Sequence, residues 1–407
     1  MTADKSTPVA PTLRFPEFQQ SPAWSTRELG DVFCERQETG FSELRLLSVT
    51  DREGVVPQEE TNRRNSSNSD KANYLRVAPG DIVYNTMRML EGRSAHVGME
   101  GIVSPAYTVC MPGTDTNSNF FSYYFKTNTL LKQFRRYSQG LVKDTLSLKY
   151  EVFSRLPVGF PLPDEQRKIA DCLGSLDDLI AAEGSKLEAL RRHKKGMLQQ
   201  LFPQEGEAVP RLRFPEFRNE GEWEEKKAGS LFANRINKGE KGLPIYSVTM
   251  HDGMVRRDSL DRNVKDIEEA GNKTVRKNDI AYNMMRMWQG ALGVAPEDCL
   301  VSPAYIVLAP KKHVIPRFFE YLFKLPTSLI LSTSYSRGLT KDRLRLYYDD
   351  FARIPIRCPT EPEQQRIAEC LCSLDVCVAA QARRLDVLGV HKHGLLQQLF
   401  PSSEDNE

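Results

Sequence analysis

Arginine, lysine and asparagine side chains are concentrated in two polar segments of the chain, residues 54–76 and 253–276. An arginine can pair with guanine, and an asparagine with adenine, through two hydrogen bonds to the edge of the base. A variable, solvated loop is the alternative interpretation of each segment. The candidates for base contacts are Arg63, Arg64, Asn65 and Lys71 in the first segment and Arg256, Arg257, Arg262 and Lys273 in the second.

The two segments occupy the same place in two copies of one sequence unit. LRFPEF stands at residues 13–18 and again at 212–217, and HKKGMLQQLFP at 193–203 returns as HKHGLLQQLFP at 391–401. Between these ends the copies stay in register apart from a one-residue slip, although the two polar segments share little sequence. A period this long indicates a duplicated domain. Two similar units with approximate twofold symmetry suit a target that has two sites at a fixed separation.

Two cations are preserved between the copies and are candidates for phosphate contacts. Arg88 in DIVYNTMRM matches Arg286 in DIAYNMMRM, and Lys143 matches Lys341 in the repeated Gly-Leu-x-Lys-Asp string. Phosphate contacts fix register and orientation, so they should recur in both copies, whereas base contacts should differ. For Arg88 and Arg286 the alternative is a structural arginine that bonds carbonyls, because the surrounding string resembles core packing. Further phosphate candidates are Arg93, Arg135, Arg136, Arg337, Arg343 and Arg345.

The net charge of +2 by itself indicates no partner, but the basic residues are unevenly distributed. Residues 126–149 contain six basic residues and one acid, and residues 311–345 contain eight basic residues and two acids. Basic patches on a nearly neutral chain fit a face that binds a polyanion. A solvated surface is the alternative for either patch, and the recurrence in both copies weighs against it.

Several classes of protein are disfavoured by what the sequence lacks. The eight cysteines form no CxxC pair, and those near residue 370 are interpreted as small apolar residues of a helix, with no metal site expected. Without a signal peptide or a long apolar run, the chain is expected in the cytoplasm with reduced thiols and no membrane contact. No methyltransferase Asn/Asp-Pro-Pro-Tyr/Phe string, P-loop or Gly-x-Gly-x-x-Gly turn occurs. We therefore expect no intrinsic catalysis.

Each copy begins with a region of mixed α and β character that lacks a βαβ rhythm. Short apolar runs at residues 44–49, 81–84 and 106–111 predict strands, bounded by Pro-Gly turns. Aromatic and leucine residues at helical spacing predict one helix over residues 120–134, with its counterpart at 316–331.

A long helix follows in each copy. Apolar residues alternate at steps of four and three for more than four heptads, which predicts a coiled-coil seam. In both copies polar residues interrupt this seam at the same two positions, Glu183 and Lys194 in the first and Gln381 and Lys392 in the second. The seams are Ile169, Leu173, Leu176, Ile180, Glu183, Leu187, Leu190, Lys194, Met197, Leu201, and Ile367, Leu371, Leu374, Val378, Gln381, Leu385, Leu388, Lys392, Leu395, Leu399.

One such helix cannot bury its seam alone, so the two are expected to pack within the chain. Only a short linker follows the first helix, so the simplest way for the two helices to pack is antiparallel. Parallel packing would require the chain to run back along the helices through the second domain. The expected fold is α+β, with two similar globular domains joined by two long helices that form an intramolecular, antiparallel coiled coil. The expected segments are domain 1 at 1–160 (1–12 flexible), spacer helix 1 at 161–203, linker 204–210, domain 2 at 211–358, spacer helix 2 at 359–401 and tail 402–407.

Over residues 13–401 the chain resembles the DNA-specificity subunits of type I restriction-modification systems. The strings that carry the resemblance are LPDEQRKIADCLGSLD with HKKGMLQQLFP, EPEQQRIAECLCSLD with HKHGLLQQLFP, the paired GDIVYNTMRM and NDIAYNMMRM, and the two SPAY strings. The resemblance implies a non-catalytic subunit whose two domains each recognise one half of a bipartite, asymmetric sequence in double-stranded DNA.

The resemblance also implies partners. Two modification subunits would dock on the helices, bind S-adenosylmethionine and methylate adenine, and motor-nuclease restriction subunits that use ATP and Mg²⁺ could join them. No cofactor is expected in this chain itself. A stand-alone DNA-binding regulator, or a specificity adaptor of another defence complex, is the alternative function.

Overall fold

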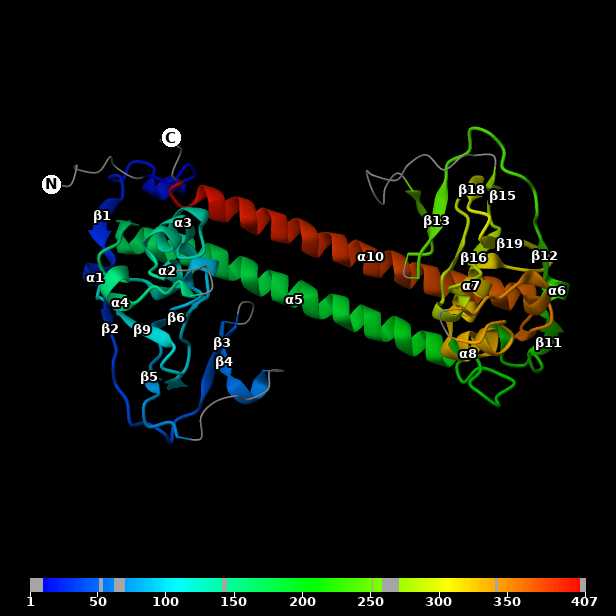
Figure 1. The fold of residues 1–407 in the computed structure, drawn as a ribbon, viewed down its shortest axis with the longest axis horizontal. Coiled ribbons are helices and arrows are strands. Elements are labelled where there is room, and N and C mark those ends of the chain that lie inside the picture. Colours follow the sequence, from blue (N-terminus) through cyan, green and yellow to red (C-terminus); the bar gives the residue numbers. More distant parts are fainter. Residues whose placement is uncertain are drawn as a thin grey trace. The chain divides into compact units, whose positions relative to one another are not determined.

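The structure is a computed structural model that describes residues 10–50, 54–61, 70–140, 145–250, 252–257, 271–340 and 343–402. The chain divides into two compact units. Unit 1 comprises Met1–Gly184 with Arg383–Glu407, and unit 2 comprises Ser185–Ala382. Each unit thus contains one copy of the mixed α and β region, part of the long helix that follows it, and part of the other long helix (Figure 1). The compact units therefore do not coincide with the linear segments expected from sequence.

A four-stranded antiparallel sheet forms the centre of each unit. In unit 1 the order is β2 (Phe33–Glu35), β9 (Tyr107–Pro112), β6 (Ile82–Asn85), β7 (Ser94–His96). In unit 2 it is β12 (Phe232–Asn234), β19 (Tyr305–Pro310), β16 (Ile280–Asn283), β17 (Leu292–Val294). Successive side chains of β6 enter different apolar clusters, Ile82 and Tyr84 one and Val83 the other. This alternation follows from the two-residue period of a strand, so both faces of the sheet are buried.

Smaller antiparallel strand pairs surround each sheet. In unit 1 they are β1 (Ser25–Glu28) with β10 (Pro157–Phe160), β3 (Leu47–Thr50) with β4 (Gly54–Pro57), and β5 (Leu75–Val77) with β8 (Gly101–Val103). In unit 2 they are β11 (Glu224–Lys227) with β20 (Pro355–Cys358), β13 (Tyr246–Val248) with β14 (Met254–Arg256), and β15 (Lys273–Val275) with β18 (Cys299–Val301). The strands expected at 44–49, 81–84 and 106–111 correspond to β3, β6 and β9, shifted by one to three residues at their ends. Short helices α1 (Leu29–Val32), α4 (Tyr150–Phe153), α6 (Ala228–Leu231) and α9 (Tyr348–Phe351) complete the units.

The single helix expected over residues 120–134 is two helices, and that expectation was wrong. In unit 1 the helices are α2 (Ser118–Tyr124) and α3 (Asn128–Tyr137), and in unit 2 they are α7 (Pro316–Lys324) and α8 (Pro326–Ser334). In unit 1 Thr127 is extended and its hydroxyl donates to the Tyr124 carbonyl at 2.8 Å, closing the first helix. In unit 2 the ring of Pro326 disfavours a helical Leu325. The apolar residues keep helical spacing across each break, because the two helices on either side of it pack on the same core.

The long helices are α5 (Pro163–Leu201) and α10 (Glu361–Gln398). Their predicted seams are confirmed, because every seam residue is buried or half-buried. In unit 1 the beginning of α5, with Ile169 and Leu173, shares one apolar cluster with Leu395 and Leu399 near the end of α10. In unit 2 Leu201 at the end of α5 shares a cluster with the beginning of α10. The helices therefore pack antiparallel in each unit. In the part of the chain that the structure describes, no helix is long and apolar enough to cross a membrane.

Candidate nucleic-acid interface

A sharp turn after the central strand carries the preserved arginine in each unit. The side chain of Asn85 accepts a hydrogen bond from the Met87 amide at 3.1 Å, and Asn283 does the same for Met285 at 3.0 Å. An asparagine that bonds a backbone amide two residues ahead stabilises a turn. The next residue, Arg88 or Arg286, is exposed, whereas the methionine after it is buried. The repeated Tyr-Asn-x-Met-Arg-Met string thus anchors a turn in the core and presents an arginine to solvent.

Neither guanidinium group bonds a carbonyl among the described residues, so the structural alternative considered for these two side chains is wrong there. The Arg88 guanidinium lies 3.5 Å from Glu91 in an exposed ion pair. Arg286 makes no side-chain hydrogen bond or ion pair with any residue that the structure describes. Both side chains therefore face solvent, since among the described residues Arg286 is unpaired and Arg88 is held only by a solvent-exposed ion pair.

The other two repeated strings converge on the same turn. In unit 1 the Thr86 amide donates to the carbonyl of Ala106 in the SPAY string, and the Thr86 carbonyl accepts from the Leu148 amide at 2.8 Å. In unit 2 the amide of Met284 donates to Ala304, and its carbonyl accepts from Leu346 at 2.9 Å. Leu148 and Leu346 follow the Gly-Leu-x-Lys-Asp strings in sequence. Each unit therefore holds its turn between the SPAY strand end and the base of the lysine-containing loop.

A glycine that tolerates no side chain begins each lysine-containing loop. Gly140 and Gly338 have φ of 157° and 152°. A Cβ atom at Gly140 would lie 2.6 Å from the Thr145 carbonyl oxygen, and one at Gly338 would lie 2.5 Å from that of Arg343. Each glycine lets the two sides of its loop approach closely. Lys143 and Lys341, the predicted phosphate contacts, lie outside the described residues.

Basic side chains surround this framework at different positions in the two units. In unit 1 they lie on α3, where Lys132, Arg135 and Arg136 are exposed. The corresponding residues of α8 are uncharged, whereas unit 2 has the exposed Arg343 and Arg345 where the first copy has Thr145 and Ser147. Neither of these two arginines makes a side-chain bond or ion pair within the described chain. The preserved framework thus carries a different distribution of positive charge in each unit.

Several predicted phosphate contacts have partners inside their own unit. Arg337 pairs with the buried Asp350 at 2.6 Å, and the hydrogen bond from Arg337 lowers the pKa of that carboxyl. Arg93 lies 3.8 Å from Glu91. In the basic stretch 311–345, Arg317 and Lys324 both pair with Glu320. The density of basic residues in sequence therefore overstates the free positive charge.

The base-contact candidates fall into three groups. Lys71 is half-buried before β5, Arg256 is exposed on β14, and Arg257 is half-buried beside it, with its amide bonded to the Ile245 carbonyl. Lys273 donates to the Tyr305 carbonyl at 2.7 Å, and burial lowers the pKa of its ammonium group. Its counterpart in the register of β5 is Leu75, which indicates an internal role for Lys273. Arg63, Arg64, Asn65 and Arg262 lie outside the described residues.

The contacts that hold each unit on its helices were not foreseen from sequence. Tyr123 on α2 donates to Asp177 on α5 at 2.7 Å, and Lys392 on α10 pairs with the same carboxylate. In unit 2 Tyr321, Asp375 and Lys194 repeat this Tyr–Asp–Lys node. The buried Glu165 pairs with Arg14 through two bonds of 2.7 and 2.6 Å, as Glu363 does with Arg213 at 2.8 and 2.7 Å. The signal in sequence was the lysine that interrupts each seam at the same place.

The geometry agrees with the comparison against protein families. The family described as type I restriction modification DNA specificity domain matches residues 23–192 and again residues 220–388. The chain belongs to this family. Its role is therefore DNA sequence specificity, and the two matches cover the two copies found in its sequence.

Relatives of this specificity chain match it over nearly the whole length. A putative type I restriction enzyme MjaX specificity subunit from Methanocaldococcus jannaschii is 20% identical, with 93% of this chain and 92% of that protein covered. The crystal structure of a type I restriction-modification S subunit from M. genitalium matches with a TM-score of 0.59 at 15% identity, covering 97% of this chain and 100% of that one. A chain from a structure concerned with complex assembly and conformational transition of the type I R-M system matches with a TM-score of 0.53 at 16% identity, covering 94% and 98%. These two structures share the fold of this chain.

Proposed function

We propose that the specificity chain recognises a bipartite, asymmetric sequence in double-stranded DNA, with one half-site bound by each unit. The main support for this proposal is that both units keep the same turn-and-loop framework but have exposed cations at different positions. Preserved positions such as Arg88 and Arg286 then contact phosphates, and the diverged segments 54–76 and 253–276 contact bases. Different side chains in the two units allow an asymmetric target, which two identical units could not distinguish.

The chain acts in this proposal as a non-catalytic subunit. Two modification subunits dock on α5 and α10, bind S-adenosylmethionine and methylate adenine in the recognised sequence. Restriction subunits that use ATP and Mg²⁺ join where the host encodes them. The antiparallel packing of α5 and α10 in each unit supports this arrangement, because the two helices offer similar surfaces in opposite directions.

The experiment is methylation mapping across the host genome with and without the chain. The expected result is loss of adenine methylation at one bipartite motif with a fixed gap. A second strain should carry the chain with residues 253–257 and 271–276 exchanged for their first-copy counterparts. Only the second half of the motif should change in that strain. Unchanged methylation in the deletion strain would contradict the proposal.

Intrinsic catalysis and stand-alone regulation are separated by two further measurements. The purified chain, supplied with S-adenosylmethionine, ATP and Mg²⁺, should neither methylate nor cleave DNA, and turnover by the chain alone would contradict a non-catalytic role. Affinity purification from native lysate should recover a methyltransferase. Recovery of the chain by itself on promoter DNA would favour a regulator.

A further inference from the structure

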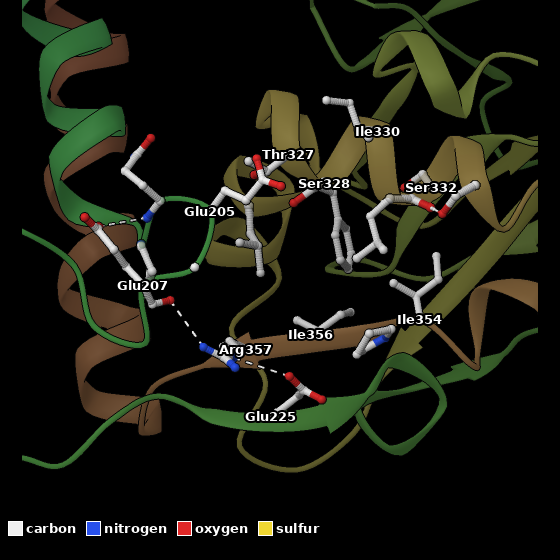
Figure 2. Close-up of a pocket in the computed structure, with 18 of the residues that line it drawn as sticks. Glu205, Glu207, Glu225, Thr327, Ser328, Ile330, Ser332, Ile354, Ile356 and Arg357 are labelled. Atoms are coloured by element: carbon white, nitrogen blue, oxygen red, sulfur yellow. Dashed lines mark hydrogen bonds and ion pairs between the residues drawn. The ribbon is translucent and has the colours of Figure 1, made fainter.

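Unit 2 contains a cavity of ≈ 510 Å³ that opens to solvent. Its walls come from α8, from Ile354 and Ile356 at β20, and from the segment that follows α5, with Glu205 and Glu207. In Figure 2, Ser328 and Ser332 lie on one side and Ile354 and Ile356 on the other. Cavities of this size with apolar walls and a few polar groups are typical of ligand sites.

The first copy shows what belongs in this space. In unit 1 the ring of Phe134 is buried against Phe125 at 5.7 Å and against Phe153 at 6.2 Å. The rings of Phe125 and Phe153 are 5.7 Å apart, and the matching pair in unit 2, Phe323 and Phe351, is 5.6 Å apart. The two phenylalanines that support Phe134 are therefore preserved in unit 2.

The ring that would rest on this preserved pair is missing from unit 2. Ser332 stands 198 positions after Phe134, at the same place in the second helix of its pair. Ser328 likewise replaces the buried Leu130. Phe323, Phe351, Ser328 and Ser332 all line the cavity. Two large-to-small differences thus leave an apolar space where the chain itself places an aromatic side chain in the other copy.

The surroundings of the cavity indicate the chemistry of an occupant. Ile330 at its edge is 72% exposed, whereas the first copy has Lys132 at that position. Glu225 is paired with Arg357 and Glu207 with Arg211. Glu205 is exposed, and its carboxylate has no partner among the residues that the structure describes. An apolar space beside an unpaired acid favours an aromatic group with an adjacent positive charge.

We propose that this cavity, lined by Ser328, Ser332, Phe323 and Phe351, is a docking site for an aromatic side chain of a partner protein, with a neighbouring basic residue paired to Glu205. A protein side chain is the occupant because a phenylalanine of this same chain fills the equivalent space in unit 1. Aromatic side chains buried in pockets are typical anchors of protein interfaces. The equivalent space in unit 1 is filled by Phe134, so only unit 2 offers this site. One partner molecule would therefore use it, even if both units bind a partner in other respects in the same way.

The test uses the full-length chain and a blocked Arg-Phe-Arg tripeptide labelled with fluorine on its ring. Fluorine NMR titration should show saturable binding. The Ser332→Phe variant, which supplies the ring found in unit 1, should bind about tenfold more weakly or not at all. Glu205→Gln should weaken binding of Arg-Phe-Arg but not of Gly-Phe-Gly, and Arg-Ala-Arg should not bind.

Two controls keep the result interpretable. Ser328→Leu restores the second residue of the first copy and fills the cavity differently, so it replaces Ser332→Phe if that variant does not fold. Both variants should retain the DNA affinity of the natural chain. Equal binding of Arg-Phe-Arg to the natural and filled variants would overturn the proposal. So would equal binding of Arg-Ala-Arg, or absence of saturable binding to the natural chain.

Discussion

Lys392 on α10 pairs with Asp177 on α5, 215 positions earlier in the chain. The same carboxylate accepts a hydrogen bond from Tyr123 on α2, so one acid joins three helices of unit 1. Burial, together with this hydrogen bond, raises the pKa of Tyr123, so its hydroxyl remains a donor even at alkaline pH. The lysine that interrupts the apolar seam is thus neutralised by an acid whose position only the antiparallel packing could supply.

Breaking this node should cost little stability but loosen unit 1 on its helices. Lys392→Met should lower the free energy of unfolding by about 1 kcal/mol, because the pair is partly exposed to solvent. If unit 1 binds one half-site, the variant should also tolerate a wider range of gaps between half-sites. DNA affinity measured on duplexes with gaps lengthened or shortened by single base pairs checks this. Lys195→Met, an exposed lysine of α5, is the matched control and should change neither quantity.

The buried pair at the start of α5 should matter more to stability. Glu165 is 1% exposed and holds Arg14 through two bonds. Glu165→Ala should destabilise the chain by about 3 kcal/mol in urea titrations, because it leaves a partly buried guanidinium without its carboxylate. Glu17→Ala removes an exposed pair with Lys168 and should leave the urea midpoint unchanged. Equal effects of the two variants would contradict this account.

The loop glycines should be essential to DNA binding. Gly140→Ala and Gly338→Ala each place a methyl group within 2.6 Å of a carbonyl oxygen, so the backbone at Thr145 or Arg343, just after the Gly-Leu-x-Lys-Asp string, must shift. We expect lower DNA affinity with little change in helix content, measured by fluorescence anisotropy and circular dichroism. Gly196→Ala in α5 faces open space and should leave the affinity unchanged. Unaltered DNA binding by both loop variants would exclude these loops from the interface.

Salt dependence should separate phosphate contacts from internal cations. The logarithm of the DNA-binding constant falls as the logarithm of the salt concentration rises. Arg286→Ala should make this fall less steep by about 0.9, the value for one phosphate contact on duplex DNA. Lys273→Met should leave the slope unchanged, since its ammonium group bonds the Tyr305 carbonyl. A reduced slope for Lys273→Met and an unchanged one for Arg286→Ala would reverse these assignments.

Helices and strands of this protein were largely predictable from sequence where patterns among neighbouring residues determine them. Steps of three and four residues predicted α5 and α10, and apolar runs located β3, β6 and β9. The same helical spacing missed the breaks at Thr127 and Leu325, because helices on either side of a break pack on one core and keep its pattern. Arg88 and Lys273 illustrate the limit for single residues. Both were proposed as DNA contacts, but only Arg88 lies on a turn that presents it to solvent.

The sequence by itself determined that the protein is a duplicated unit with two amphipathic helices, because repetition and periodicity are properties of neighbouring residues. Only the tertiary structure decided which distant residues meet. It paired Lys392 with Asp177 and joined the three repeated strings at one turn. It also showed that Ser332 leaves empty the place that Phe134 fills. These relationships depend on how helices and strands pack across long stretches of chain, and no local pattern encodes that packing.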